Sequence, residues 1–312
     1  MDTTDPRVII GSGSNSPART EVGRLPLWPR LLGIVGGVGP FAHIEFERHL
    51  LQAAKERMEK LKKSSKGPKQ ETTDQEFPPW IVASLPQIPD RTKALEMKGP
   101  SPVPMLLHGL DLLNRCECDF ALIPCNTAHA WISELDPVSR IPILDMVQAA
   151  TREAVNLFGS ATRLGLLATD GTVDYDVYPS RAASISKKIQ FVSPLNLAGG
   201  RSTQETVMNC IYGPKKEDGT RSGGIKSGCH LADPSLRMRM QHDLCQIIAQ
   251  MAEHGAEAII LGCTELPLII DQAVIFEQLN RNIQLIDPME IAAKVAIRIA
   301  AGEDQICPRS SG

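Results

Sequence analysis

The chain has 312 residues, of which 42% are hydrophobic and 4% aromatic, a composition that allows a sizeable and mostly aliphatic core. Its formal net charge of −3 and its pI of about 6.2 exclude the basic surface that nucleic-acid-binding domains carry. No apolar run approaches the ~20 residues that cross a bilayer. We therefore expect neither a nucleic-acid partner nor a membrane partner.

The N-terminal segment, residues 1–29, is rich in Ser, Thr, Gly, Pro and Arg and has no sustained hydrophobic period, which predicts a flexible tail. Asp2, Asp5 and Arg7 interrupt the apolar segment that a secretory signal needs, so a cytoplasmic protein is expected. An organellar transit peptide remains an alternative, although the acidic residues count against it.

The ordered part is expected to begin at residues 31–35, a short apolar run typical of a buried strand, followed by a glycine-rich turn at 36–40. Apolar residues recur at helical spacing over 41–61, and the polar stretch 62–79 predicts an exposed loop. The further strands predicted are 80–85, 119–124, 143–146, 163–168, 189–192, 258–261 and 284–286, and the further helices are 102–117, 127–135, 147–157, 177–186, 202–212, 234–254 and 288–301. Strands that alternate with helices predict an α/β fold with mostly parallel sheets, whose sites lie beyond the carboxyl ends of the strands.

Two segments of the chain, residues 119–127 and 257–265, follow one plan: an acidic residue, an apolar strand, Pro or Gly, then a cysteine. Cys125 and Cys263 are therefore expected at a strand end and a helix N-terminus, where N–H groups and the helix dipole favour a thiolate. A single free cysteine is most often a small buried hydrophobe. That interpretation does not explain two such positions with hydrogen-bonding neighbours, so we predict that both thiols react in one cleft.

The other six of the eight cysteines are expected to be ordinary reduced thiols, because the chain carries no export signal. Cys116 and Cys118 have C-x-C spacing, but no His or Cys cluster with the spacing of zinc ligands follows them. No metal site is expected.

Five ordered segments resemble the signatures of the aspartate/glutamate racemase superfamily, in particular its aspartate racemase branch. They are C-N-T-A-H at 125–129, L-G-C-T-E-L-P at 261–267, G-G-V-G-P at 36–40, P-Q-I-P-D-R-T at 86–92, and I-Y-G with I-K-S-G at 211–213 and 225–228. The resemblance covers residues 31–301 and departs from the family pattern at Val38, where the family has Met. It implies two similar lobes related by a pseudo-twofold axis, each a mostly parallel sheet flanked by helices, with the active site between them. Residues 30–148 with 288–312 would form the first lobe, and 149–287 the second.

The resemblance also implies a reaction: cofactor-independent racemisation of aspartate, with glutamate or a broader range of amino acids as the alternative. One cysteine would remove the α-proton as a thiolate, and the other would deliver a proton to the opposite face as a thiol. Homodimers are common in the family, and no cofactor is expected. Asn126, Thr127 and Thr264 would bind the α-carboxylate and ammonium, and Arg91 and Lys226 would face the distal carboxylate. The residues further assigned to the substrate site are Gln87, Val38 and Thr169.

Several positions stay open at this level. The polar insertion 214–224 is expected to be flexible and to belong to a lid, and it makes the place of Lys226 uncertain, with Lys215 or Lys216 as substitutes. His129 either tunes the thiolate of Cys125 or simply caps and packs its helix. Thr169, Gly171 and Thr172 complete the cleft or form a turn. Glu265 is expected to be an ordinary residue of a helix start.

Three rival functions are considered. Residues 37–42 fit the loose G-x-G-x-x-A pattern of a dinucleotide-binding turn, but the strand 81–85 has no acidic residue at its end to hold a ribose. A thiol-dependent isomerase or decarboxylase of a small dicarboxylate would share the cleft, although a decarboxylase would leave one cysteine idle. A catalytically silent binding protein would need neither thiol.

Overall fold

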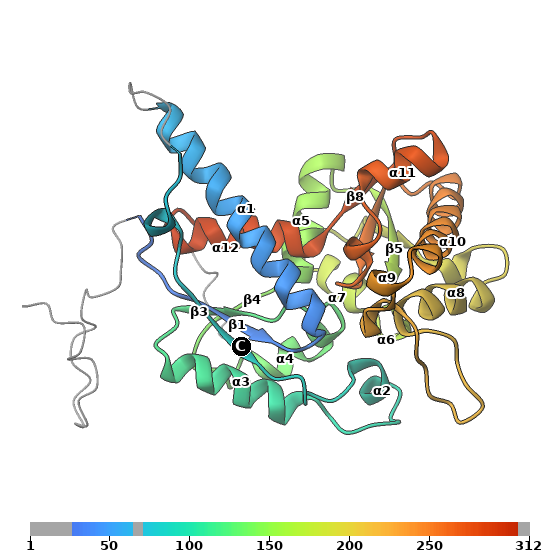
Figure 1. Ribbon diagram of the computed structural model, residues 1–312, viewed down its shortest axis with the longest axis horizontal. Helices are drawn as coiled ribbons and strands as arrows, with labels where there is room; N and C mark the ends of the chain where they lie inside the picture. Colours follow the sequence, from blue (N-terminus) through green and yellow to red (C-terminus); the bar gives the residue numbers. More distant parts are fainter. Residues whose placement is uncertain (1–26, 65–70, 305–312) are drawn as a thin grey trace, which may run out of the picture.

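The computed structural model describes residues 27–64 and 71–304, which form two α/β lobes side by side (Figure 1). Each lobe contains a four-stranded parallel sheet, in the order β2-β1-β3-β4 in the first lobe and β6-β5-β7-β8 in the second. Counted from its own first strand, each sheet has the same order, so the two lobes repeat one topology. The predicted α/β fold with two similar parallel-sheet lobes is confirmed.

The strands are β1 (Leu32–Gly36), β2 (Trp80–Ser84), β3 (Phe120–Leu122), β4 (Ile143–Leu144), β5 (Arg163–Ala168), β6 (Gln190–Val192), β7 (Ala258–Gly262) and β8 (Gln284–Ile286). The α-helices are α1 (Pro40–Ser64), α2 (Arg91–Leu95), α3 (Val103–Arg115), α4 (Ile132–Leu135), α5 (Met146–Phe158), α6 (Asp170–Val173), α7 (Val177–Ala182), α8 (Arg201–Tyr212), α9 (Cys229–Ala232), α10 (Pro234–Glu253), α11 (Gln272–Leu279) and α12 (Pro288–Ala300). Short 3-10 helices are η2 (Asp74–Glu76), η3 (Thr127–Trp131), η4 (Pro194–Asn196), η5 (Ile225–Ser227) and η6 (Leu266–Leu268). None of the helices in the described ranges is both long and apolar enough to cross a membrane.

The predicted strands are all present, but the stretch 62–79 is not simply a loop. Helix α1 continues to Ser64, and η2 forms a short turn beyond it. Lys62 of α1 pairs with Glu76 of η2 at 2.7 Å, which brings the two ends of this stretch together. Helices α2, α6, α9 and α11 are not predicted from the sequence, because four to eight residues are too few to show a helical period.

The first sheet is buried on both faces, as a parallel sheet requires. Successive residues of β1 point to opposite sides: Ile34 packs with Phe46 of α1 and Met289 of α12, while Val35 packs with Leu106 of α3. This alternation explains why the strand is a continuous apolar run in the sequence.

The second sheet is built in the same way. Ile259 of β7 packs on the side of α8 and α10, and Ile260 packs on the side of α5 and α7. The chain crosses between the lobes twice, at α5 and at α12, and these two helices pack against each other (Figure 1).

This topology positions the site. In each sheet the strand order reverses between the two central strands, β1 and β3 in one and β5 and β7 in the other, and a crevice forms beyond their carboxyl ends. Cys125 follows β3 and Cys263 follows β7, so each lobe supplies one thiol from its own crevice.

The predicted tail ends earlier than expected. Residues 1–26 lie outside the described residues, but Trp28 is 0% exposed in the core of the first lobe. Its indole N–H donates to the carbonyl of Glu76 at 2.9 Å, and the guanidinium of Arg57 lies 5.0 Å from its ring centre. Trp28 therefore belongs to the folded lobe, and its assignment to the tail is wrong.

Trp28→Ala should lower the free energy of unfolding by about 3–5 kcal/mol, because it empties a fully buried site that cannot fully collapse. Urea unfolding followed by circular dichroism measures this loss. Leu27→Ala is the matched control: Leu27 is 38% exposed, and its loss should stay within about 0.5 kcal/mol. Equal losses in the two variants would contradict the placement of Trp28.

Candidate active site

A narrow, nearly closed cavity lies between the two lobes and is lined by both thiols. The residues that line it are Arg91, Cys125, Asn126, Thr127, Thr169, Tyr212, Lys226, Cys263, Thr264 and Glu265. The structure thus brings together residues from six separate stretches of the chain. All the site residues named from the sequence are in this set except Gln87 and Val38.

Gln87 and Val38 are not among the residues that line the cavity, so their assignment to the substrate site stays a prediction. Gln87 is exposed in the turn that follows β2. Val38 is buried in the apolar core of the first lobe, in the same cluster as Cys125. Its aliphatic side chain supports the loop beneath the thiol and offers no polar group to a ligand.

The thiol of Cys125 lies beside a buried cation. Asp90 caps the short helix α2 by accepting from the N–H of Lys93 at 2.9 Å, and this turn directs Arg91 into the cavity, where it is 7% exposed. Arg91 donates from Nη1 to the carbonyl of Pro89 at 3.0 Å, while its buried Nε has no hydrogen-bond partner among the described residues. Burial opposes its charge, but interaction with Cys125, Tyr212 and Asp90 outweighs burial and raises the pKa of Arg91.

The thiol of Cys263 lies beside a buried anion. Its Sγ–H donates to Oε2 of Glu265 at 3.0 Å, and Thr264 donates its hydroxyl to the same oxygen at 3.2 Å. The other oxygen of Glu265 pairs with Nζ of Lys226 at 2.6 Å. Glu265 is 1% exposed, so it is a buried member of the site and not the ordinary helix-start residue expected from the sequence.

The charges of this group support one another. Burial opposes ionisation of Glu265, but Lys226 more than offsets it and lowers the pKa of the carboxyl. Burial likewise opposes the charge of Lys226, and Glu265 raises the pKa of that amine well above its usual range. Burial, together with the charge of Glu265, raises the pKa of the Cys263 thiol. Cys263 is therefore held as a thiol in this state.

This result corrects the expectation that a helix N-terminus favours a thiolate at both cysteines. The short 3-10 helices η3 and η6 come directly after Cys125 and Cys263, and such short segments have little dipole to offer. At Cys263 the neighbouring carboxylate decides the protonation state instead.

The glycine-rich turn after β1 makes room for Glu265. Gly39 has a φ of 97°, and a Cβ there would meet Oε1 of Glu265 at 2.6 Å. The space that this glycine leaves is thus filled by a carboxylate of the other lobe, which would repel a pyrophosphate. This contact accounts for the glycine pattern without a dinucleotide. Within the described ranges, no three His, Cys, Asp or Glu side chains are grouped as metal ligands would be.

Three threonine hydroxyls join the lobes at the cavity wall. Thr127 of the first lobe lies 3.2 Å from the hydroxyl of Thr169 and 2.8 Å from that of Thr172, and the latter two are 3.3 Å apart. All three are buried. Thr169 therefore lines the cavity on the side of the second lobe, while Thr172 lies behind it and its N–H donates to the Thr169 carbonyl in the turn that starts α6.

His129 has the structural role that the sequence left as one of two possibilities. Its Nε2 accepts from the backbone N–H of Met146 at 3.1 Å, so the proton resides on Nδ1, which donates to the carbonyl of Cys125 at 2.8 Å. Burial lowers the pKa of His129 and keeps the ring neutral. The imidazole thus fixes the backbone at Cys125 through its carbonyl group.

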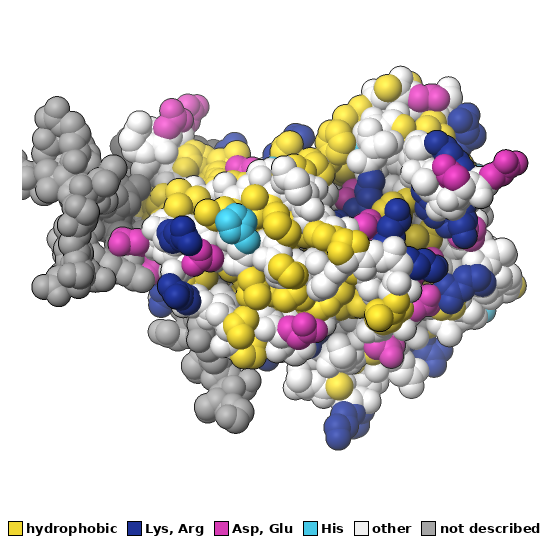
Figure 2. Space-filling model, turned by 90° about the horizontal axis from the view of Figure 1, so that it is seen from below, with side chains coloured by type: hydrophobic (Ala, Val, Ile, Leu, Met, Phe, Trp, Pro, Cys, Tyr) yellow, Lys and Arg dark blue, Asp and Glu magenta, His cyan; other side chains and the backbone are white. Residues whose placement is uncertain are grey.

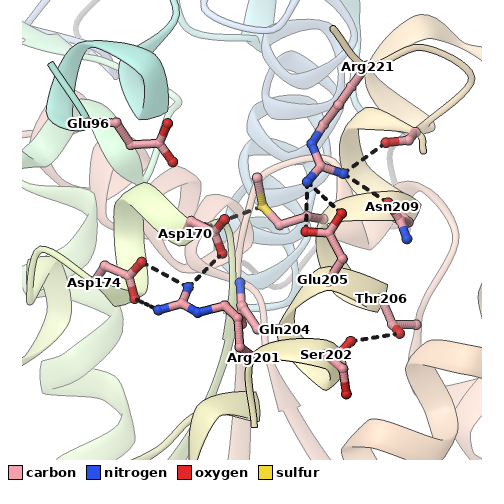
Figure 3. Close-up of polar contacts among 12 residues, drawn as sticks. Glu96, Asp170, Asp174, Arg201, Ser202, Gln204, Glu205, Thr206, Asn209 and Arg221 are labelled. Atoms are coloured by element: carbon pink, nitrogen blue, oxygen red, sulfur yellow. Dashed lines mark hydrogen bonds and ion pairs between the residues drawn. The ribbon is translucent and has the colours of Figure 1, made fainter. Parts of the chain in front are cut away.

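The insertion forms a hairpin, residues 213–224, that projects from the lower edge of the second lobe (Figure 1). Arg221 anchors it to α8: the guanidinium bonds both carboxylate oxygens of Glu205 at 2.7 Å and the side chain of Asn209 at 2.8 Å (Figure 3). The predicted role of the hairpin as a lid stays a prediction.

Lys226 follows the hairpin and lines the cavity, whereas Lys215 lines a separate outer pocket between α2, α8 and the hairpin. Lys and Arg side chains gather on the second-lobe half of the face seen from below (Figure 2).

Tyr212 lies between the cavity and the outer pocket and lines both. Its hydroxyl donates to Oδ2 of Asp90 at 3.1 Å, a bond that crosses from one lobe to the other.

Comparison with known proteins gives the family. The family model of Asp/Glu/Hydantoin racemases matches residues 35–209 and 230–296. The chain belongs to this family. The match is interrupted over the stretch that contains the hairpin and Lys226, in agreement with the departure seen in the sequence.

Individual relatives are distant. The chain is 24% identical over 191 residues to a glutamate racemase of Geobacter metallireducens. These residues make up 61% of this chain and 59% of the relative, so the chain spans less than two thirds of the relative's length. It is 22% identical over 272 residues to the broad specificity amino-acid racemase RacX of Bacillus subtilis, covering 86% and 96%. The solved structure of Picrophilus torridus aspartate racemase superposes with a TM-score of 0.64 at 24% identity, covering 88% and 94%, a likeness that shows the fold.

Glu265→Gln should lower the pKa of Cys263, because it removes the negative charge that opposes the thiolate and leaves Lys226 in place. The pH dependence of alkylation of Cys263 by iodoacetamide, followed by mass spectrometry of its peptide, should move to lower pH. Glu257→Gln, at the exposed opposite end of β7, is the matched control and should leave the profile unchanged. Identical profiles for wild type and Glu265→Gln would show that the carboxylate does not govern this thiol.

Proposed function

We propose that the protein is a cofactor-independent amino-acid racemase that interconverts L- and D-aspartate by two-base proton transfer. The observation that carries the proposal is the pair of thiols, one from each lobe, in a single cavity with opposite electrostatic surroundings. Cys125 lies beside the cation Arg91, and Cys263 lies beside the anion Glu265. Membership of the Asp/Glu/Hydantoin racemase family supports the same reaction class.

The surroundings assign starting roles to the two thiols. Because Cys263 is held as a thiol, the starting base is Cys125, which lies beside Arg91; it removes the α-proton as a thiolate and becomes a thiol. Cys263, held as a thiol by Glu265, gives its proton to the opposite face of the α-carbon and becomes a thiolate. The centre is inverted because the proton leaves one face and another arrives at the other. The reverse reaction starts from the opposite protonation states.

The intermediate carbanion needs stabilisation, because an α-proton is a very weak acid. Removal of this proton moves negative charge onto the α-carboxylate, so fixed donors around that carboxylate bind the transition state more strongly than the substrate. One buried donor in the cavity, Nδ2 of Asn126, has no hydrogen-bond partner in the described part of the chain. It is suited to this task, and Thr127 adds a hydroxyl.

Substrate choice depends on the two cations. Arg91 can bind a carboxylate with its planar guanidinium and makes no ion pair with a carboxylate among the described residues. Lys226 is already paired with Glu265 at 2.6 Å. This pair favours a second candidate, a racemase of broader specificity or of glutamate. Lys226 could bind the distal carboxylate of a substrate only while it also stays paired with Glu265. A thiol-dependent decarboxylase is less well supported, because it would leave one of the two thiols idle.

Replacement of either cysteine by Ala should lower racemisation by about 10²- to 10⁴-fold, the usual contribution of a positioned acid or base. In D₂O without pyridoxal phosphate, each variant should still exchange the α-proton of one enantiomer, because the remaining thiol can remove and return a proton on its own face. Cys263→Ala should exchange faster than Cys125→Ala at neutral pH, since burial and the charge of Glu265 raise the pKa of Cys263, the thiol that remains in Cys125→Ala. Proton NMR and chiral chromatography over a panel of amino acids measure exchange and inversion.

The control for this experiment is Cys116→Ala, which changes an exposed cysteine at the end of α3 and should keep full activity. A single-cysteine variant that racemises at the wild-type rate would refute the two-base scheme. Wild-type protein that neither exchanges nor inverts any common amino acid would refute racemase activity itself.

Arg91→Lys should lower kcat/KM for aspartate by about 10- to 100-fold relative to alanine, because it keeps the charge beside Cys125 but loses the two-pronged contact with a carboxylate. Arg91→Ala should reduce turnover of both substrates, since it also removes the cation beside Cys125. Initial rates by chiral chromatography on aspartate, glutamate and alanine separate these effects. An unchanged ratio of aspartate to alanine in Arg91→Lys would contradict its role in substrate choice.

A further inference from the structure

Tyr178, on α7 of the second lobe, reaches across the cleft to a cavity residue of the first lobe. Its hydroxyl donates to Oδ1 of Asn126 at 2.7 Å. The ring is 0% exposed and packs near Phe191, with 6.3 Å between ring centres. Burial raises the pKa of the Tyr178 phenol well above its usual range, so the hydroxyl always carries its proton and acts as a donor.

This bond decides which way the amide of Asn126 faces. Asn126 is 1% exposed, lines the cavity and follows Cys125 directly. Because Oδ1 accepts from Tyr178, the amide presents Nδ2 elsewhere, and Nδ2 has no hydrogen-bond partner within residues 27–64 and 71–304. If the amide were turned over, Nδ2 would face the Tyr178 oxygen and the phenol proton would lack its acceptor. Oδ1 of Asn126 would then take the place of Nδ2 and would repel a ligand carboxylate.

We infer that Tyr178 is a positioning residue that fixes the side-chain amide of Asn126 with its N–H donors available to a substrate carboxylate. The inference rests on the proposed function for the identity of the ligand, a small amino or organic acid with a carboxylate. Tyr178 does not line the cavity and acts only through Asn126.

The bond also ties this donor to the closed arrangement of the lobes. Asn126 belongs to the loop after β3 and Tyr178 to α7, and the two segments are in contact. Movement of one lobe away from the other breaks the bond and frees the amide to turn. The carboxylate site is therefore complete only when both lobes surround the substrate.

A double-mutant cycle of Tyr178→Phe and Asn126→Ala tests the inference. The probes are L-aspartate, for kcat and KM of racemisation, and succinate, an unreactive dicarboxylate whose affinity calorimetry measures. Tyr178→Phe should lower kcat/KM for aspartate and the affinity for succinate by about 10-fold, and Asn126→Ala should lower kcat/KM by about 100-fold, since loss of an oriented donor to developing charge has effects of this order.

The decisive comparison is made in the Asn126→Ala background, where Tyr178→Phe should change kcat/KM by less than about 2-fold, because the group that it orients is gone. A further 10-fold loss there would overturn the inference, since Tyr178 would then act through the general packing of the core. An unchanged Tyr178→Phe single variant would also overturn it. Tyr175→Phe, the same chemical change at an exposed position on the preceding turn, is the matched control and should behave as wild type.

A second measurement serves if Tyr178→Phe does not fold. In the wild-type protein the side-chain NH₂ signals of Asn126, assigned by their loss in Asn126→Asp, should shift on addition of succinate, and signals that do not move would refute the inference. The two proposals fail separately. A protein that binds succinate in a Tyr178-dependent manner but racemises nothing refutes the racemase, and an active racemase indifferent to Tyr178→Phe refutes the positioning role.

Discussion

The arrangement of the cavity depends on one buried negative charge. Glu265 is almost fully enclosed, and a carboxylate in such a place is stable only if a cation neutralises it and donors surround it. Lys226 supplies the cation, Cys263 and Thr264 supply donors, and the turn at Gly39 in the other lobe leaves the space. The same charge sets the protonation of one of the two thiols.

The consequence is an asymmetric site in a nearly symmetric fold. The two lobes repeat one strand order and place their cysteines after equivalent strands. The residues that touch the two thiols differ, however: Arg91 approaches Cys125 from α2, and Glu265 follows Cys263 within the same loop. Repetition of the fold thus supplies the geometry for attack from two faces, and divergence of the neighbours supplies the difference in charge that a proton transfer needs.

The separation along the chain between two interacting residues decides whether the sequence can predict their contact. The apolar strands and the cysteines after them depend on local pattern, and most cavity residues lie in motifs close to a strand end. Glu265 and Tyr178 could not be placed in this way, because their partners are 39 and 52 residues distant: Lys226 lies elsewhere in the second lobe, and Asn126 lies in the first lobe. The burial of Trp28 was missed for a similar reason: its partner Glu76 is 48 residues away, and the segment around it has the composition of a tail.

The hairpin between Tyr212 and Lys226 has a consequence for how this family can diversify. Its two ends, Gly213 and Gly224, touch so closely that neither has room for a Cβ, and the chain leaves and re-enters the lobe at nearly one point. Residues inserted or deleted between Gly213 and Gly224 change the length of the hairpin without moving Tyr212 or Lys226. A longer surface loop adds little entropic cost to folding. Evolution can therefore remodel the outer pocket in this region while the cavity beneath keeps its spacing.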